Sequence, residues 1–374
     1  MEMHYLDNAA TTRVLPEAAQ AAMKAMTEEY GNPSALYALG AEARRALSQA
    51  RADVALALGC KAEQLVFTSC GTEAINTALF SAVYRGRRIG RHIVSTHIEH
   101  KATLETLKAL ESEGCEVTLV DPQPDGTVSA EEILAAVRED TALVTMMAVN
   151  SETGAILPTA QVAEGLKHRN SAAMLHIDAV QAFCKIPFDP APYDFVSVSG
   201  HKIGACKGVG ALYAKNIKTV RPRILGGGQE NGLRSGTEGM PQIMSFGAAA
   251  RLRGGQTAEN AAKMQALKQE ILLRLTELPC GVRINSPENS APHILNISPE
   301  KGRSEVLLRV LSDEGVFVSG GSACSRGRRS EVLTAMKVPA KAIDSALRIS
   351  LCPETTHEDV EALLEGLKKA LAFF

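Results

Sequence analysis

Short apolar runs rich in β-branched residues alternate with longer stretches of helical periodicity over the first half of the chain. Strands buried on both faces are unbroken apolar runs, so this alternation predicts a mostly parallel sheet whose strands are linked by helices. Ser129 and Glu132 have the capping-box spacing at the start of one helix. The predicted strands are 65–68, 92–96, 116–120, 143–149, 174–177 and 195–198, and the other helices between them are 72–84, 102–113 and 160–168.

The pattern changes in the C-terminal third of the chain. A long helical pattern over 257–278 precedes short strand-like segments and two further helices. This mixture predicts a smaller α+β domain, with a hinge near Gly254 and Gly255. We expect a large domain over 15–255 and a small domain over 1–14 and 256–374. The predicted strands here are 282–285, 293–297 and 316–319, and the predicted helices are 304–313 and 357–371.

Composition narrows the classes of partner. The 374 residues are 45% hydrophobic, which is enough for a sizeable core. Lys and Arg number 40 against 42 Asp and Glu, a net charge of −2. A chain without a basic excess is not expected to bind nucleic acid. No apolar run is long enough for a membrane span, and the N-terminus lacks the apolar core of a secretion signal, so we expect a cytoplasmic protein without a membrane partner.

The cysteines do not form a recognisable framework. No two of them have C-x-x-C spacing, which disfavours a zinc knuckle or a redox dithiol. Without a secretion signal, a disulfide scaffold is not expected, and most of these residues are expected to be small buried side chains. We expect no metal site. The cysteines are Cys60, Cys70, Cys115, Cys184, Cys206, Cys280, Cys324 and Cys352.

A lysine after the strand-like run 195–198 carries the strongest chemical signal. Lys202 follows the sequence SVSGH and precedes a glycine-rich stretch. At the carboxyl end of a strand, desolvation lowers the pKa of a lysine toward that of a usable amine. Taken alone, however, the pattern favours a surface lysine in a glycine-rich loop.

Two further features change that balance. Asp178 directly follows a strand-like run, with Gln181 three residues later; such an acid can be a cap, a metal ligand or the partner of a pyridinium nitrogen. Gly71 and Thr72 lie at a strand–turn–helix junction, which is either an anion cradle or a plain capped helix. Together, a lysine, an acid and an anion cradle are what a pyridoxal cofactor held as a Schiff base needs.

Motifs in a fixed order identify a family. The chain resembles the NifS-like cysteine desulfurases of the class V aminotransferase superfamily, whose members have the fold type I of pyridoxal-phosphate enzymes. The resemblance implies an α/β fold with a seven-stranded type of sheet and a smaller α+β domain. The motifs are YLDNAATT at 5–12, YGNPS at 30–34, THIEHK at 96–101, GGGQENGLRSGT at 226–237 and GSACS at 321–325.

The resemblance implies a role for each residue around the ring of pyridoxal 5'-phosphate. Lys202 would hold the cofactor covalently and later move the Cα proton of the substrate. Asp178 would pair with the pyridine nitrogen, and Gln181 would hydrogen-bond the phenolate oxygen. His100 would stack on the ring and assist as an acid or a base.

The resemblance also implies how the phosphate is held. Gly71 and Thr72 would bind it at the start of a helix, together with Ser199 and His201. Thr237 would reach the phosphate from a second subunit, so the chain would be a homodimer.

Cys324 is the cysteine that differs, because it lies in a glycine-rich segment followed by Arg326, Arg328 and Arg329. Nearby cations favour the thiolate form. The resemblance implies that Cys324 takes the sulfur of L-cysteine as a persulfide, leaving L-alanine, and passes it to an acceptor protein for iron–sulfur clusters, thio-cofactors or tRNA. Arg348 would bind the substrate carboxylate, to which a planar guanidinium is well matched. The arginines after Cys324 could also help to dock an acidic acceptor.

Some positions depart from the family pattern. Ser151 stands where the family has an asparagine that contacts the cofactor and the substrate carboxylate; Tyr37 and Cys206 replace a histidine and a proline. Ser151 therefore keeps two alternatives open: a related enzyme (a selenocysteine lyase, β-lyase or aminotransferase) and an accessory protein that binds the cofactor without turnover. Cys324 argues against a plain aminotransferase, which needs no thiol there.

Overall fold

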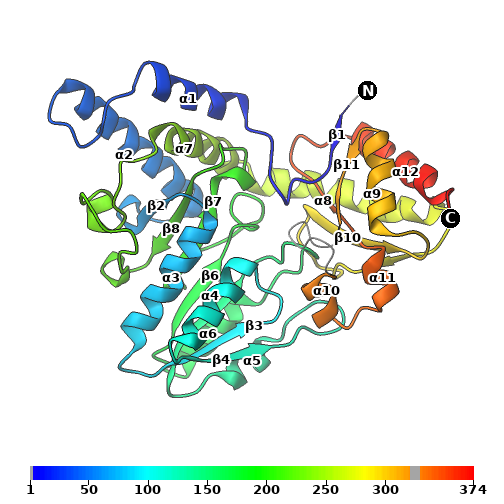
Figure 1. Ribbon diagram of the computed structural model, residues 1–374, viewed down its shortest axis with the longest axis horizontal. Helices are drawn as coiled ribbons and strands as arrows, with labels where there is room; N and C mark the ends of the chain where they lie inside the picture. The colour runs from blue at the N-terminus through cyan, green and yellow to red at the C-terminus, as the bar shows by residue number, and fades with distance from the viewer. Residues whose placement is uncertain (1–2, 321–328) are drawn as a thin grey trace.

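The computed structural model describes residues 3–320 and 329–374; Cys324 and the two arginines after it, Arg326 and Arg328, lie outside the described residues. In the described part, the strands form a seven-stranded sheet, a four-stranded sheet and a two-stranded pairing. Figure 1 shows the larger sheet with its helices on one side of the molecule and the smaller sheet on the other. Strand β1, at the start of the described chain, and the C-terminal helix α12 both lie on the side of the smaller sheet (Figure 1).

The larger sheet confirms the predicted mostly parallel architecture. Strand β8 is antiparallel to both of its neighbours, whereas the other pairs are parallel. Every residue of β5 is buried, as expected for a strand covered on both faces. The order across the sheet is β2 (Leu65–Thr68), β8 (Gly210–Ala214), β7 (Phe195–Ser199), β6 (Met174–Asp178), β5 (Thr141–Met147), β3 (His92–Thr96) and β4 (Glu116–Val120).

Helices cover both faces of this sheet. Alternate residues of one strand enter different cores: Leu143 packs in a cluster with α3 and α4, and Val144 in a cluster with α2 and α7. The sheet therefore lies in the middle of three layers. The helices of this part are α1 (Pro16–Thr27), α2 (Ala38–Leu58), α3 (Gly71–Gly86), α4 (Lys101–Ser112), α5 (Ala130–Ala136), α6 (Thr159–His168) and α7 (Met240–Gly254), with short 3-10 helices at Ala62–Gln64, Gly200–Lys202, Ile217–Thr219 and Glu230–Gly232.

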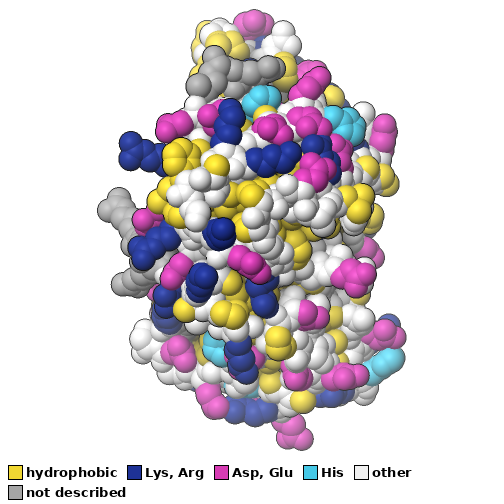
Figure 2. Space-filling view, turned by 90° about the vertical axis from the view of Figure 1, so that its right-hand side faces the viewer, with side chains coloured by type: hydrophobic (Ala, Val, Ile, Leu, Met, Phe, Trp, Pro, Cys, Tyr) yellow, Lys and Arg dark blue, Asp and Glu magenta, His cyan; other side chains and the backbone are white. Residues whose placement is uncertain are grey.

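The smaller sheet is antiparallel and has its own apolar cluster, to which Leu6 near the N-terminus belongs. The elements are β9 (Val282–Ile284), β10 (Ile294–Pro299), β12 (Ser319–Gly320) and β13 (Leu347–Ser350), β1 (His4–Tyr5) paired with β11 (Val316–Phe317), and helices α8 (Thr257–Arg274), the 3-10 helix Leu275–Glu277, α9 (Ser304–Asp313), α10 (Glu331–Ala335), α11 (Ala340–Asp344) and α12 (His357–Leu371). The domain boundaries at 14/15 and 255/256 stay predictions. On the face of this part shown in Figure 2, acidic and basic side chains are interspersed.

Several local predictions were wrong in part; the strand expected over 143–149, for example, is β5 over Thr141–Met147. The expected strand 316–319 is two short strands, because β11 pairs with β1 whereas β12 pairs with β13. The helix expected over 257–278 ends at Arg274 and continues as a 3-10 turn. The capping box is half formed: Ser129 Oγ accepts from the Glu132 amide at 3.3 Å, but the Glu132 carboxylate accepts from Gln123 Nε2 instead.

No helix in the described ranges combines the length and the apolar character that crossing a bilayer requires.

Candidate active site

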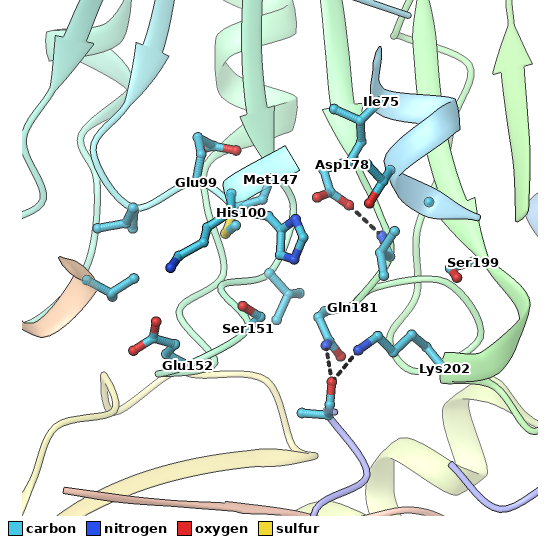
Figure 3. Close-up of a pocket in the computed structure, with 18 of the residues that line it drawn as sticks. Ile75, Glu99, His100, Met147, Ser151, Glu152, Asp178, Gln181, Ser199 and Lys202 are labelled. Carbon is cyan, nitrogen blue, oxygen red and sulfur yellow. Dashed lines mark hydrogen bonds between the residues drawn. The ribbon is translucent and has the colours of Figure 1, made fainter. Parts of the chain in front are cut away.

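The carboxyl ends of the parallel strands, together with β13, enclose a cavity of about 410 Å³. Ligands of open α/β sheets bind at this edge. Except for Thr237 and Cys324, every candidate site residue named from the sequence lines this cavity: Gly71, Thr72, His100, Ser151, Asp178, Gln181, Ser199, His201, Lys202 and Arg348. Figure 3 shows six of them, His100, Ser151, Asp178, Gln181, Ser199 and Lys202, around the cavity. Thr237 lies elsewhere, beside a second cavity of about 280 Å³.

Lys202 ends a single 3-10 turn that follows β7. Its Nζ donates to the carbonyl oxygens of Ala9 and Ala10, at 2.6 and 2.7 Å. Gln181 Nε2 donates to the Ala9 oxygen as well, at 2.9 Å, and these two bonds meet at one atom in Figure 3. The N-terminal segment, rather than the sheet alone, therefore sets where the lysine amine lies.

Asp178 and His100 face each other across the cavity (Figure 3). Asp178, the last residue of β6, is 5% exposed, and its Oδ1 accepts from the Val180 amide at 2.9 Å. Burial raises the pKa of Asp178, while His100 and Lys202 oppose that rise. His100 caps α4, because its Nδ1 accepts from the Ala102 amide at 3.0 Å, which fixes the imidazole ring. A cation or a positively charged ring N–H between these residues would satisfy the buried acid.

The start of α3 forms a cradle that fits a phosphate. A Cβ at Gly71 would lie 2.9 Å from Val180 Cγ2, so only glycine leaves this space open. Ser199 Oγ is buried beside it and has no hydrogen-bond partner among the described residues. Backbone N–H groups at a helix N-terminus and an unpartnered hydroxyl suit an anion. Burial lowers the pKa of His201 to about 4, with Lys202 adding to the effect, so this imidazole is neutral at pH 7.

Arg348, on β13, also lines the cavity. Its Nη2 contacts Asp7 Oδ1 at 2.7 Å, and its Nη1 donates to the Ser151 carbonyl at 3.0 Å. Arg348 Nε is buried and has no partner in the part of the chain that the structure describes. Because a guanidinium carries five N–H donors, these contacts leave a donor-rich edge on which a carboxylate fits. The contact of Ser151 is made by its backbone.

Glu99 and Glu152, two acids that also line the cavity, escaped the sequence analysis. Burial raises the pKa of Glu99 to about 8, and its Oε1 accepts from Thr96 Oγ1 at 2.6 Å. Burial likewise raises the pKa of Glu152 to about 7, and this carboxyl group accepts a hydrogen bond from Ser330. Glu99 shares one signal with Asp178, since both lie at or just after the end of a parallel strand.

Comparison with known proteins shows which proteins resemble this chain in sequence and in fold. The family model described as aminotransferase class V matches residues 4–363. A cysteine desulfurase of Trichormus azollae is 38% identical over 374 aligned residues, covering 98% of this chain and 92% of that protein. A solved NifS-like protein superposes with a TM-score of 0.93, at 38% identity and with all of both chains covered. A solved structure described as SspA in complex with cysteine has a TM-score of 0.83 and 30% identity, covering 95% of this chain and 100% of that chain.

The chain belongs to the class V aminotransferase family. The resemblance found from the ordered motifs is thereby confirmed, and so is the fold. Class V aminotransferases and cysteine desulfurases depend on pyridoxal phosphate in general. The lysine, the buried acid and the phosphate cradle of this cavity fit that group.

Proposed function

We propose that this chain is a pyridoxal-phosphate-dependent cysteine desulfurase. It converts L-cysteine to L-alanine and transfers the sulfur to an acceptor protein. One observation carries the proposal: a lysine amine, a buried carboxyl group, an anion cradle and a guanidinium line a single cavity. The 38% identity to a cysteine desulfurase over nearly the whole chain supports the choice of substrate.

The residues that would hold the cofactor occupy distinct sides of the cavity. Gly71, Thr72, Ser199 and His201 would bind the phosphate, as the open cradle and a Ser199 hydroxyl without a partner among the described residues favour. Lys202 would hold the cofactor covalently. The ring contacts would come from Asp178 at the pyridine nitrogen, Gln181 and Ser151 at the phenolate oxygen and His100 at the ring face. When bound, pyridoxal phosphate supplies an electron sink that stabilises negative charge on the substrate Cα.

Each remaining step would use a residue of this chain. Arg348 would bind the substrate carboxylate through donors that Asp7 and Ser151 leave open. Once displaced by the substrate amine, Lys202 would take the Cα proton, for which it must leave the carbonyls of Ala9 and Ala10. His100 would assist as an acid or a base near the ring.

Sulfur transfer is assigned to Cys324, which lies outside the described residues. Its thiolate would attack the substrate sulfur, so that an S–S bond forms while the substrate Cβ–S bond breaks. Protonation of the remaining three-carbon unit then yields alanine. The acceptor would take the outer sulfur of the persulfide, for use in iron–sulfur clusters or in thiolated cofactors and tRNA.

The location of Thr237 supports the presence of a second subunit. It lies beside a different cavity of its own chain, so a contact with the phosphate would have to come from a partner copy. We therefore propose a homodimer. Sedimentation of the cofactor-loaded protein should give twice the 39.8 kDa mass of the chain, and a loaded species at 39.8 kDa would overturn this part.

The decisive experiment is an absorbance spectrum of the purified protein, followed by addition of L-cysteine and quantification of alanine. A yellow band and catalytic alanine are expected. A band without alanine would favour a related lyase or a protein without turnover, with Ser151 the first position to revert to asparagine. No band after addition of pyridoxal phosphate would overturn the proposal.

Two variants separate the roles of the lysine and the cysteine. Lys202→Ala is expected to lose the covalent chromophore and the activity together. Cys324→Ala is expected to keep the chromophore and lose persulfide formation. Sulfide release by Cys324→Ala at the native rate would show that this cysteine is not the acceptor.

A further inference from the structure

A second lysine lies behind the cavity wall. Lys185 is 8% exposed, and its Nζ donates to Gln181 Oε1 at 2.8 Å. Gln181 is itself buried, with 4% of its surface exposed. Lys185 follows Gln181 by four residues in the turn after β6, so both side chains rise from one short segment.

The two ends of the Gln181 amide are held by different partners. Lys185 provides a hydrogen for the oxygen, and the Ala9 carbonyl oxygen can only accept, here from Nε2 at 2.9 Å. A primary amide has nearly the same shape when its oxygen and nitrogen are exchanged, so only its partners determine which end faces a ligand. Here both partners select the same orientation. Nε2 retains one further N–H for a group in the cavity.

Lys185 donates to Gln181 Oε1 in surroundings that disfavour its charged form. Burial holds the pKa of Lys185 well below the ordinary lysine range, and the neighbouring cations Lys202 and Arg348 lower it further. Cys184 and Cys352 are the groups that oppose this shift. A neutral amine still has N–H groups to donate. A buried amine costs free energy unless it makes a hydrogen bond. The hydrogen bond to Gln181 therefore stabilises Lys185 in its buried position.

We propose that Lys185 is a positioning residue that fixes the Gln181 amide with its nitrogen toward the phenolate oxygen of the cofactor. The inference rests on the proposed function, which assigns that contact to Gln181. An N–H donor stabilises the phenolate, whereas a reversed amide would present an oxygen and repel it. Lys185 thus acts on the cofactor only through Gln181.

The test uses the cofactor-loaded protein and the pH titration of its absorbance band. Lys185→Met removes the donor and keeps a side chain of similar length. Because the phenolate loses a stabilising donor, the midpoint of the titration is expected to rise by about one pH unit, equivalent to a tenfold change in proton affinity. The matched control is Lys268→Met: Lys268 is also buried, but it donates to Ser290 Oγ and the Ala291 carbonyl outside the cavity. Its midpoint should stay at the wild-type value.

A double-mutant cycle separates this role from a purely structural one. In a Gln181→Ala background, Lys185→Met should cause no further shift, since the group it orients is gone. An unchanged midpoint in Lys185→Met, or a full shift that persists in the Gln181→Ala background, would overturn the inference. If Lys185→Met does not fold, Lys185→Leu, which also removes the donor, takes its place with the same expected rise of the midpoint and the same contradicting outcomes. A wild-type protein without a cofactor band would instead refute the proposed function itself.

Discussion

Arg348, which lines the cavity, and Asp7, which is 341 residues away in the sequence, form an ion pair at 2.7 Å. The side chains are 7% and 19% exposed, so water screens the pair only weakly. The same N-terminal segment accepts hydrogen bonds from Lys202 and Gln181 through the Ala9 carbonyl. The segment that follows β1 thus places an anion and a carbonyl against three residues of the candidate site.

This geometry predicts the outcome of Arg348→Lys. One ammonium group cannot keep Asp7 and the Ser151 carbonyl as partners and also present two parallel donors to a substrate carboxylate. Loss of one charged hydrogen bond corresponds to a KM for L-cysteine that rises about tenfold or more, with a smaller effect on kcat. Steady-state kinetics measures both. Arg274→Lys, at a partly exposed arginine paired with Glu277 and Glu361, is the control and should leave KM unchanged. Equal KM values for the two variants would contradict the assignment.

The cradle at the start of α3 gives a second prediction. In Gly71→Ala the new methyl group would lie 2.9 Å from Val180 Cγ2 and 3.4 Å from Ser199 Cβ. Overpacking of this size costs about 1–3 kcal/mol, which we expect as weaker binding of pyridoxal phosphate. The measurement is the Kd of pyridoxal phosphate compared with that of pyridoxal, since only the former uses the cradle. Gly255→Ala has open space around it and serves as the control. An undiminished preference for the phosphorylated form would refute the cradle.

Much of the larger sheet could be predicted because its strands are buried on both faces. The run 92–96 is a strand with the predicted limits, and α12 has the predicted limits as well. Helix α2 gave no prediction: its buried face consists largely of small residues such as Ala43 and Ala50, which contrast little with the exposed face. The strand with which a segment pairs is not set by the local sequence either. For this reason the segment 316–319 forms two short strands with different partners.

Residues of the candidate site could be predicted where a reactive side chain comes at or just after the end of a strand-like run in the sequence, as for Asp178 and Lys202. The contribution of the N-terminal segment to the site could not be predicted, since a backbone carbonyl such as that of Ala9 carries no sequence signal. Burial of Glu99 is likewise a tertiary property. The position of Thr237 relative to a partner subunit stays a prediction.

A third prediction concerns stability. Glu230 is 8% exposed, its carboxylate binds both terminal nitrogens of Arg51, and its Oε2 also accepts from the Phe67 amide at 2.8 Å. Removing one partner leaves a buried charge and an unpaired amide, so Glu230→Ala should lower the free energy of unfolding by about 3–5 kcal/mol. Thermal melting would show the loss. The control Glu29→Ala breaks the surface pair with Lys24 and should cost less than about 1 kcal/mol. Similar melting temperatures for the two variants would contradict the prediction.

The buried carboxyl group of Glu99 predicts a pH-dependent stability. Its folded pKa of about 8 lies above the ordinary value of 4.5, so between these pH values the folded chain holds a proton that the unfolded chain has released. Folding therefore becomes less favourable as pH rises through this window, by at most about 1.4 kcal/mol per pH unit, and the penalty is constant above it. Glutamine at this position has no proton to lose.

Glu99→Gln should therefore gain melting temperature relative to the wild type as pH rises from 5 to 8, with the smallest gain at pH 5. Glu105→Gln is the matched control, because Glu105 is exposed and its bond to Lys108 lowers the pKa of its carboxyl group. A lowered pKa adds stability at higher pH, so the control should show no such gain. A difference between Glu99→Gln and wild type that is the same at both pH values would mean that Glu99 is already ionised in the folded chain. Its Oε2, which has no partner within 3–320 and 329–374, would then need a cation from the substrate or cofactor.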